Sequence, residues 1–219
     1  MFKLTKTNKS ALLALTLLFF LNNISYAEGY KNSKEYFTEI ENKILVLNKT
    51  TLNTLEELNL AELYKNIGKD EQAEEICKKV LAKEKNNTFA LYLMGDLYKR
   101  KYLLNEAIYY LKKVPSIAPE YKKAVVKLME TYVLTKDEIQ ADILVKDVMF
   151  LNDEETLNLV LAILNYSPLK LNVATAELNF DEVLKINPKE TNSLYYLASI
   201  RLEQNNRKVS RELFNKAIE

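Results

Sequence analysis

One spacing dominates this chain of 219 residues, because the same residue types recur every 34 positions. Three columns of identical residues show it: Ala73, Ala107 and Ala141; Tyr64, Tyr98 and Tyr132; and Val80, Val114 and Val148. Three independent columns with one period are not expected by chance. A fixed period between 20 and 50 residues is typical of stacked repeat units. The fold of most of the chain therefore follows from this period.

The columns continue to the end of the chain with one slip. Ala141 is followed by Ala176 after 35 residues, and Ala176 by Ser210 after 34. The extra residue falls in the fourth unit, and we place it near Ser167 and Pro168. We count about five units, at residues 54–87, 88–121, 122–155, 156–190 and 191–219.

Each unit is predicted to hold two helices. In the second unit, two stripes of helical spacing follow one another: Leu91, Gly95 and Tyr98, and then Ala107, Leu111 and Val114. Such spacing indicates amphipathic helices. Gly95 and Ala107 are small, so we expect the two helices to approach closely there. Thr88 is a candidate N-cap for the helix that follows it, and Gly68 a candidate terminator for the helix before it.

These residues resemble the tetratricopeptide repeat (TPR) family. The resemblance rests on the segment Leu91–Tyr98, read as LYLMGDLY, and on Ala107, Leu111, Val114 and Pro119 after it. It covers about three quarters of the chain. It implies an all-α fold, a right-handed α-solenoid of about five TPR-like helix-turn-helix units. It also implies that the first helices of the units line a concave groove in which a partner protein binds.

The first 27 residues have the features of a secretory signal peptide. Lys3, Lys6 and Lys9 are followed by an apolar run over residues 11–21 and by a small-residue cleavage site at residues 25–27. Eleven apolar residues rise only about 16 Å, whereas a bilayer core is about 30 Å thick. A retained membrane anchor is therefore the weaker alternative, and we expect no membrane span after cleavage. Export to a bacterial periplasm is the expectation, and secretion is the alternative.

Residues 28–53 lie between the signal peptide and the repeats. Apolar residues at helical spacing predict a capping helix at about residues 33–47: Phe37, Ile40, Ile44 and Leu47. Open ends of repeat stacks need such covers. The last helix also carries apolar residues: Val209, Leu213, Phe214 and Ile218. We therefore expect a second copy of the chain or a partner to cover that end, which makes the chain a candidate homo-oligomer through its C-terminal helix.

Catalysis is not expected. The chain has no His and only three Gly, which excludes His-dependent catalysis and zinc sites built on imidazole, and provides no phosphate-binding loop. Cys77 is the single cysteine and shares a core column with Leu111 and Val145, so it is predicted to be a buried hydrophobic residue. We therefore predict a protein that is not an enzyme, with no cofactor and no metal.

Charge argues against nucleic acid as a partner. The chain has 31 Lys and Arg and 30 acids, and residues 1–27 hold three of the lysines and no acid, which leaves 28 against 30. A balance this close to neutral gives no electrostatic attraction to phosphate backbones.

The first helices supply the candidate partner-binding groove. Its predicted residues are Leu58, Glu62, Phe89, Tyr92, Asp96, Lys99, Val126, Glu130, Tyr195 and Ser199. Tyr92 and Tyr195 lie one residue beyond core positions and are therefore turned by about 100° toward the groove. Acidic residues in one column disfavour a clamp for a partner's C-terminal carboxylate. We predict a partner with apolar anchors and some positive charge, bound with roughly micromolar affinity.

Together these patterns predict a non-catalytic protein-protein interaction scaffold, or an assembly factor, of the bacterial cell envelope. Its partners would be envelope proteins or peptides. An alternative is a protein that binds cell-wall glycan, which only the 14 Tyr residues favour. Fold analogy underlies the family part of this inference, and a fold does not fix a function.

Overall fold

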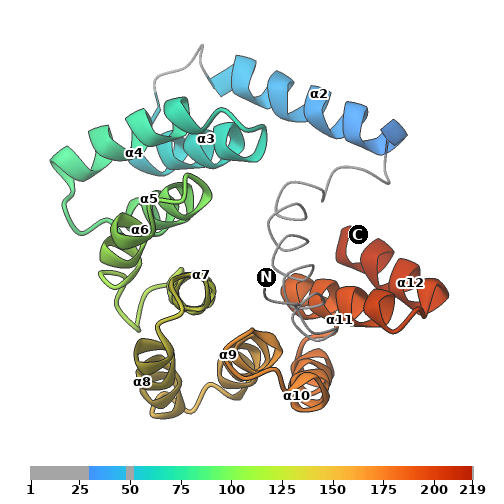
Figure 1. The fold of residues 1–219 in the computed structure, drawn as a ribbon. Helices are drawn as coiled ribbons and strands as arrows, with labels where there is room; N and C mark the ends of the chain where they lie inside the picture. Colours follow the sequence, from blue (N-terminus) through green and yellow to red (C-terminus); the bar gives the residue numbers. More distant parts are fainter. Residues whose placement is uncertain (1–29, 48–51, 219) are drawn as a thin grey trace, which may run out of the picture. The chain divides into compact units, whose positions relative to one another are not determined.

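The structure is a computed structural model that describes residues 30–47 and 52–218. The predicted signal peptide lies outside these residues. The described residues fold into helices with no strand among them, which confirms the all-α prediction (Figure 1). They form two compact units, one ending at Thr131 and one beginning at Tyr132, and this boundary falls inside a helix. Each unit is described by itself below.

The helices follow the predicted pairs in chain order. The unit up to Thr131 contains α2 (Tyr30–Leu47), α3 (Thr54–Asn66), α4 (Asp70–Lys83), α5 (Thr88–Arg100), α6 (Leu104–Leu111) and most of α7 (Tyr121–Thr135). The unit from Tyr132 contains the end of α7, α8 (Glu138–Met149), α9 (Glu154–Tyr166), α10 (Val173–Ile186), α11 (Thr191–Glu203) and α12 (Arg207–Ile218).

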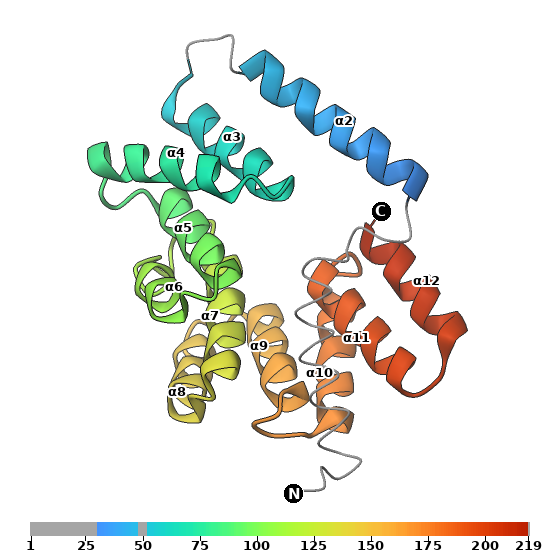
Figure 2. The same cartoon turned by 45° about the horizontal axis from the view of Figure 1, so that its top comes forward.

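Neighbouring helices pack as antiparallel hairpins that stack on the next hairpin. In the first unit α3 packs on α4 and α5 on α6, and α4 contacts α5; in the second, α9 packs on α10, α11 on α12, and α10 contacts α11 (Figure 2). The column that set the period is buried throughout: Ala73, Ala107, Ala141, Ala176 and Ser210 are each at most 2% exposed. The repeated helix-turn-helix architecture is therefore confirmed.

Gly95 explains how closely α5 and α6 approach. A Cβ atom built on Gly95 would lie 2.5 Å from Cγ and 3.3 Å from the backbone N of Leu111. Real side chains are not found at the shorter of these distances, so glycine is required unless Leu111 moves. The sequence predicted a close approach between Gly95 and Ala107, and the structure places Leu111 directly opposite the glycine.

The turn within each hairpin uses one residue in the left-handed conformation. These residues recur with the period of the alanines, slip included: Gly68, Tyr102, Lys136, Leu171 and Asn205, with φ of 76°, 61°, 58°, 53° and 60°. At the first turn the N–H of Lys69 donates to the carbonyl of Tyr64 (2.9 Å), and that of Gly68 to Lys65 (3.1 Å). This is the Schellman arrangement that ends helices. Gly68 terminates α3 as predicted.

The helix starts correct one sequence assignment. Thr88 is the first residue of α5, and the preceding Asn87 is its N-cap, with its side-chain oxygen accepting from the N–H of Ala90 (3.0 Å). Asp153 caps α9 in the same way through the N–H of Thr156 (3.0 Å). Asn and Asp are preferred over Thr at the N-cap, where a side-chain oxygen accepts from the free N–H groups of the first turn.

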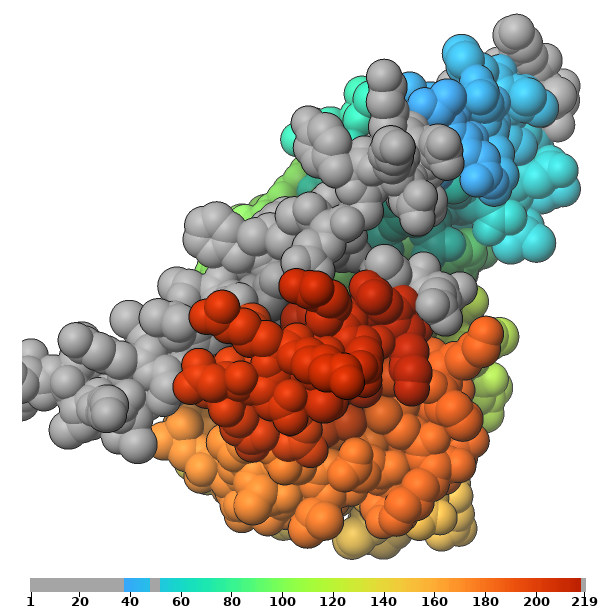
Figure 3. All heavy atoms as spheres, turned by 90° about the vertical axis from the view of Figure 1, so that its right-hand side faces the viewer, coloured from blue at the N-terminus to red at the C-terminus, as the bar shows by residue number. Residues whose placement is uncertain are grey.

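The two outer helices have apolar contacts with their neighbours. In α2, Ile40 and Ile44 form a buried cluster with Leu60 of α3. The side chain of Phe37 lies outside the described ones. At the other end, Phe214 of α12 packs edge-on against Tyr195 of α11, with ring centroids 5.6 Å apart. Figure 3 shows α12 lying over the helices that precede it in the second unit.

Candidate functional site

The predicted groove residues of the first unit line up on the first helix of each hairpin, but most are buried. Leu58 of α3 is 1% exposed, Tyr92 of α5 6% and Val126 of α7 3%. Asp96, Lys99 and Glu130 are also buried. These residues therefore pack between successive first helices, and they can offer a partner only a small part of their surface. Their role as a partner-binding surface stays a prediction.

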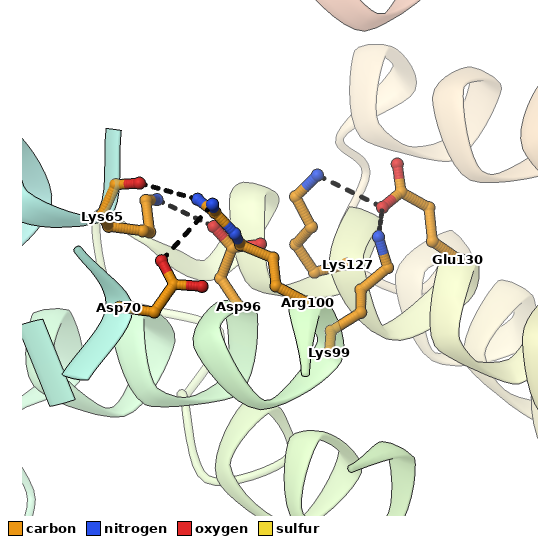
Figure 4. Close-up of polar contacts among 7 residues, drawn as sticks. All are labelled: Lys65, Asp70, Asp96, Lys99, Arg100, Lys127 and Glu130. Atoms are coloured by element: carbon orange, nitrogen blue, oxygen red, sulfur yellow. Dashed lines mark hydrogen bonds and ion pairs between the residues drawn. The ribbon is translucent and has the colours of Figure 1, made fainter. Parts of the chain in front are cut away.

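Two buried ion pairs join the first helices to one another (Figure 4). Lys65 of α3 donates to Asp96 of α5, with Nζ and Oδ2 2.8 Å apart. One repeat further on, Lys99 of α5 donates to Glu130 of α7, with Nζ and Oε2 2.5 Å apart. The second pair thus repeats the first at the equivalent positions, and together they link three consecutive first helices.

Lys127 adds a third ammonium group to this cluster. It lies on α7 one turn before Glu130, and its Nζ is 3.2 Å from the same Oε2 that binds Lys99. Lys65 also lies 5.6 Å from the ring centre of Tyr92, and the exposed Lys123 lies 5.9 Å from it. Cations at this distance from an aromatic ring are attracted to its face. We call Lys65, Asp96, Lys99, Lys127 and Glu130 the ion-pair ladder.

Every shifted pKa in the ladder favours the charged form. Burial alone would raise the pKa of the two carboxyls, but the nearby lysines outweigh it and lower the pKa of Asp96 well below its usual range and that of Glu130 to about 2. Burial alone would lower the pKa of Lys65 and Lys127, but the facing carboxylates raise both. At neutral pH the side chains of Lys65, Asp96, Lys127 and Glu130 are therefore charged.

A second set of contacts fixes α3 and α4 against α5. Arg100 donates to the backbone carbonyl of Lys65 (2.8 Å) and lies 3.3 Å from Asp70 at the start of α4 (Figure 4). Nearby, Glu74 of α4 accepts from Lys101 at 2.6 Å and from the Tyr98 hydroxyl at 3.2 Å. Hydrogen bonds from the lysines that face Glu74 lower its pKa to about 2. The hairpins are thus held together by charge as well as by packing.

The remaining candidate residues lie at more open positions. Glu62 and Phe89 are half-buried on α3 and α5, three residues before Lys65 and seven residues before Asp96. Tyr195 and Ser199 belong to α11 in the other unit, so the structure does not join them to this cluster. Tyr195 contacts Phe214 there, and the Ser199 hydroxyl donates to the backbone carbonyl of Tyr195 (3.0 Å).

The described residues offer little reactive chemistry. Cys77 is buried, and burial raises the pKa of its thiol to about 12, so the thiol stays protonated and unreactive at neutral pH. Burial likewise raises the pKa of Tyr92 to about 12. Within residues 30–47 and 52–218, no cluster of three metal-ligating side chains occurs, and no helix is long and apolar enough to span a bilayer. The arrangement is suited to holding surfaces in place.

The sequence analysis did not predict the ion pairs between neighbouring repeats. Asp96, Lys99 and Glu130 were all named as groove residues, but as independent surface charges. Lys65 and Asp96 are 31 residues apart, as are Lys99 and Glu130, which is one repeat less one helical turn. A search for opposite charges at that spacing would have found both pairs. Lys127 belongs to no column and carried no such signal.

Comparisons with known proteins find similar chains among solved structures. A scan of protein-family models and a search of curated proteins find no match. Among solved structures, the chain is similar to YrrB, a TPR protein with an unusual peptide-binding site, at 20% identity over 83% of this chain and 90% of YrrB, with a TM-score of 0.46. It is similar to MamA from Desulfovibrio magneticus RS-1 at 17% identity over 75% of this chain and 93% of MamA, with a TM-score of 0.47.

Human IFIT1, solved as a dimer with PPP-AAAA, is similar over 95% of this chain and 53% of IFIT1, at 15% identity and a TM-score of 0.51. Such low identities concern the fold alone. The class that the fold defines is therefore an all-α helical-repeat protein of TPR-like architecture.

Proposed function

We propose that the chain is a non-catalytic scaffold that binds other proteins through the first helices of its hairpins. The observation that carries the proposal is the ion-pair ladder. It links α3, α5 and α7 by buried charged contacts, so their outward edges form one preorganised surface. Preorganised surfaces bind more tightly because little side-chain entropy is lost on association. Glu62, Phe89 and Lys123 stand at the more open positions of this surface.

The ion-pair ladder changes the charge that we expect of the partner, because the sequence alone favoured a partner with some positive charge. Asp96 and Glu130 are already neutralised by lysines inside the protein, so they do not call for a cation from the partner. Apolar contacts around Phe89 are left as the main anchor. A segment with one or two apolar side chains fits this surface, and each buried anchor contributes about 1.5–3 kcal/mol before ordering costs.

The place of action that we propose is the bacterial cell envelope, with the periplasm as the compartment. The support is the N-terminal pattern of three lysines, an apolar run and a small-residue site over residues 1–27. N-terminal sequencing of the protein recovered from a periplasmic fraction tests this directly. A mature chain that begins near Glu28 supports it, and an intact Met1 in the membrane fraction contradicts it.

We further propose self-association through α12. Val209, Leu213 and Phe214 on this helix are only half-buried against α11, so apolar surface remains that a second copy could cover. Sedimentation of the purified protein over a range of concentrations tests this. A strict monomer at all concentrations argues against it.

Affinity purification from the envelope fraction tests the binding function. Phe89→Ser combined with Lys123→Glu alters the open part of the surface and replaces none of the five ladder residues. Ile117→Ser is the matched control, because Ile117 is 93% exposed and lies outside the first helices. Specific envelope proteins should be recovered with the wild type and the control and lost with the double variant. Equal recovery with all three proteins would show that this surface does not bind them.

A further inference from the structure

The helix α8 has two apolar faces, although a helix that packs on one side needs only one. Ala141, Leu144 and Val148 are buried on one side. On the other side Ile139, Ile143 and Phe150 are 73%, 42% and 81% exposed. The spacings of four and eleven residues place these three side chains within about 40° of one another around the helix. We call Ile139, Ile143 and Phe150 the α8 strip.

This strip is specific to α8. The repeat period gives the equivalent positions in the four other units, and none of these sets is apolar at all three places: Glu71, Glu75 and Ala82; Asn105, Tyr109 and Ser116; Ala174, Leu178 and Lys185; Lys208, Glu212 and Glu219. The architecture therefore does not require apolar residues there. Exposed apolar patches on otherwise polar surfaces mark sites of interaction.

The segment that carries the strip is also the most acidic part of the second unit. Residues 137–155 contain one lysine, Lys146, and seven acids: Asp137, Glu138, Asp142, Asp147, Asp153, Glu154 and Glu155. Lys170 contributes one further cation, at 2.5 Å from Glu138 and 3.5 Å from Asp142. The excess of negative charge thus persists after the known ion pairs are counted. Around the helix Asp142 and Asp147 flank the strip on its two sides, and Lys146 lies about 20° from Ile139, so the rim of the strip is acidic in balance.

From these two observations we infer that the α8 strip is a second docking surface, which binds a basic amphipathic helix of a partner protein. Apolar side chains of such a helix would cover Ile139, Ile143 and Phe150, while its lysines or arginines would face the acidic rim. Helices bind apolar surfaces through residues spaced three and four apart, and opposite charges at the rim select the partner and speed its association. This surface shares no residue with the first-helix surface proposed above.

A second copy of this chain fits the strip less well. The most basic helix among the described residues is α12, with Arg207, Lys208, Arg211 and Lys216 against Glu212. Its apolar residues Val209, Leu213 and Phe214, however, are already half-covered by α11 within its own unit. A second copy could therefore bring cations to the rim but only partly covered apolar side chains to the strip.

Two synthetic peptides test the inference on the full mature chain. One is an 18-residue helix of leucines at helical spacing with lysines elsewhere, and the other has glutamate in place of every lysine. We expect the leucine–lysine peptide to bind, the leucine–glutamate peptide to bind at least about tenfold more weakly, and the first affinity to fall as salt is raised. Fluorescence anisotropy of labelled peptides measures all three. Equal affinity for the two peptides would overturn the charge argument.

Substitutions locate the site. Ile139→Ser with Phe150→Ser should weaken binding of the leucine–lysine peptide by about tenfold or more, whereas the equally exposed control Ile117→Ser should leave it unchanged. Asp147→Lys with Glu154→Lys should weaken the same peptide and strengthen the glutamate peptide. All four positions are exposed, and circular dichroism checks that each variant is folded. Unchanged binding by the strip variant, or a homodimer of the wild type that this variant dissolves, would overturn the inference.

Discussion

Removing one charge from the ion-pair ladder should destabilise the protein far more than removing an exposed charge. We consider Asp96→Asn, which keeps the shape of the side chain but leaves the Lys65 ammonium without its counter-ion. The side chains of Lys65 and Asp96 are only 8% and 11% exposed, so water cannot replace the lost partner. Breaking a buried pair in this way costs about 3–5 kcal/mol. We expect the lower end, about 3 kcal/mol, because Glu62 and Tyr92 also favour the Lys65 charge.

That loss is a large share of the roughly 5–15 kcal/mol that stabilises a typical domain. Urea unfolding followed by circular dichroism at several concentrations gives the free energy of unfolding for each variant. The matched control is Glu182→Gln, which breaks a pair with Lys185 whose side chains are 49% and 68% exposed. Exposed pairs contribute about 0–1 kcal/mol.

A second variant separates the charge from the packing. Asp96→Asn combined with Lys65→Met removes both charges and keeps similar volumes, and it should recover most of the lost stability, because buried pairs are often replaceable by uncharged residues. If Asp96→Asn costs no more than Glu182→Gln, or if the double variant is the less stable of the two, the account of the ladder is refuted.

Three further predictions follow from the same structure. The free energy of unfolding should fall as the pH drops from about 5 to about 2, because the pKa values of Asp96 and Glu130 are lower in the folded protein than in the unfolded chain, where they are near 4. Urea midpoints measured across this pH range test the prediction, and a flat profile would contradict it. Lys136→Gly should stabilise the protein by about 0.5 kcal/mol, because glycine adopts the left-handed backbone conformation without the steric cost of a side chain. Gly68→Ala should destabilise it by about 1 kcal/mol for the same reason. Thermal unfolding compares the two variants with the wild type, and changes of the opposite sign would rule out the turn argument. Gly95→Ala should destabilise the protein by about 1–2 kcal/mol. The new methyl group would clash with the buried Leu111, and this cost exceeds the gain from the better helix propensity of alanine. A gain in stability would show that the α5–α6 contact can open.

The repeat period predicted the fold well because it reports packing. A small residue is needed wherever two helices cross closely, and the columns of Ala73 and its equivalents record that need in every hairpin. The turns were less visible. Only Gly68 and Asn205 mark the left-handed position by residue type, whereas Tyr102, Lys136 and Leu171 adopt the same conformation with side chains that do not favour it. The surrounding helices impose that conformation, so local sequence does not encode it.

Three of the five ladder residues were named from the sequence, but none of their interactions was. The sequence placed Asp96, Lys99 and Glu130 on one face of the first helices, and the structure puts them there. The sequence could not show that each of these side chains forms an ion pair with an opposite charge on a neighbouring hairpin, because that contact depends on how far successive hairpins are offset. The consequence is chemical: on a face that looked charged and open, both carboxylates are paired with lysines of the same chain, and most of the side chains are buried. The exposed apolar residues of α8 were also missed, since they match no core column.

The central claim is that the first-helix surface beside the ladder binds another protein. Site-specific photo-crosslinking in living cells tests it most directly, with a photoreactive amino acid placed at Phe89 and, as the control, at the 93% exposed Ile117. The account predicts discrete crosslinked partner proteins from position 89 that are absent from position 117. Crosslinks of the same pattern from both positions, or none from position 89, would contradict it.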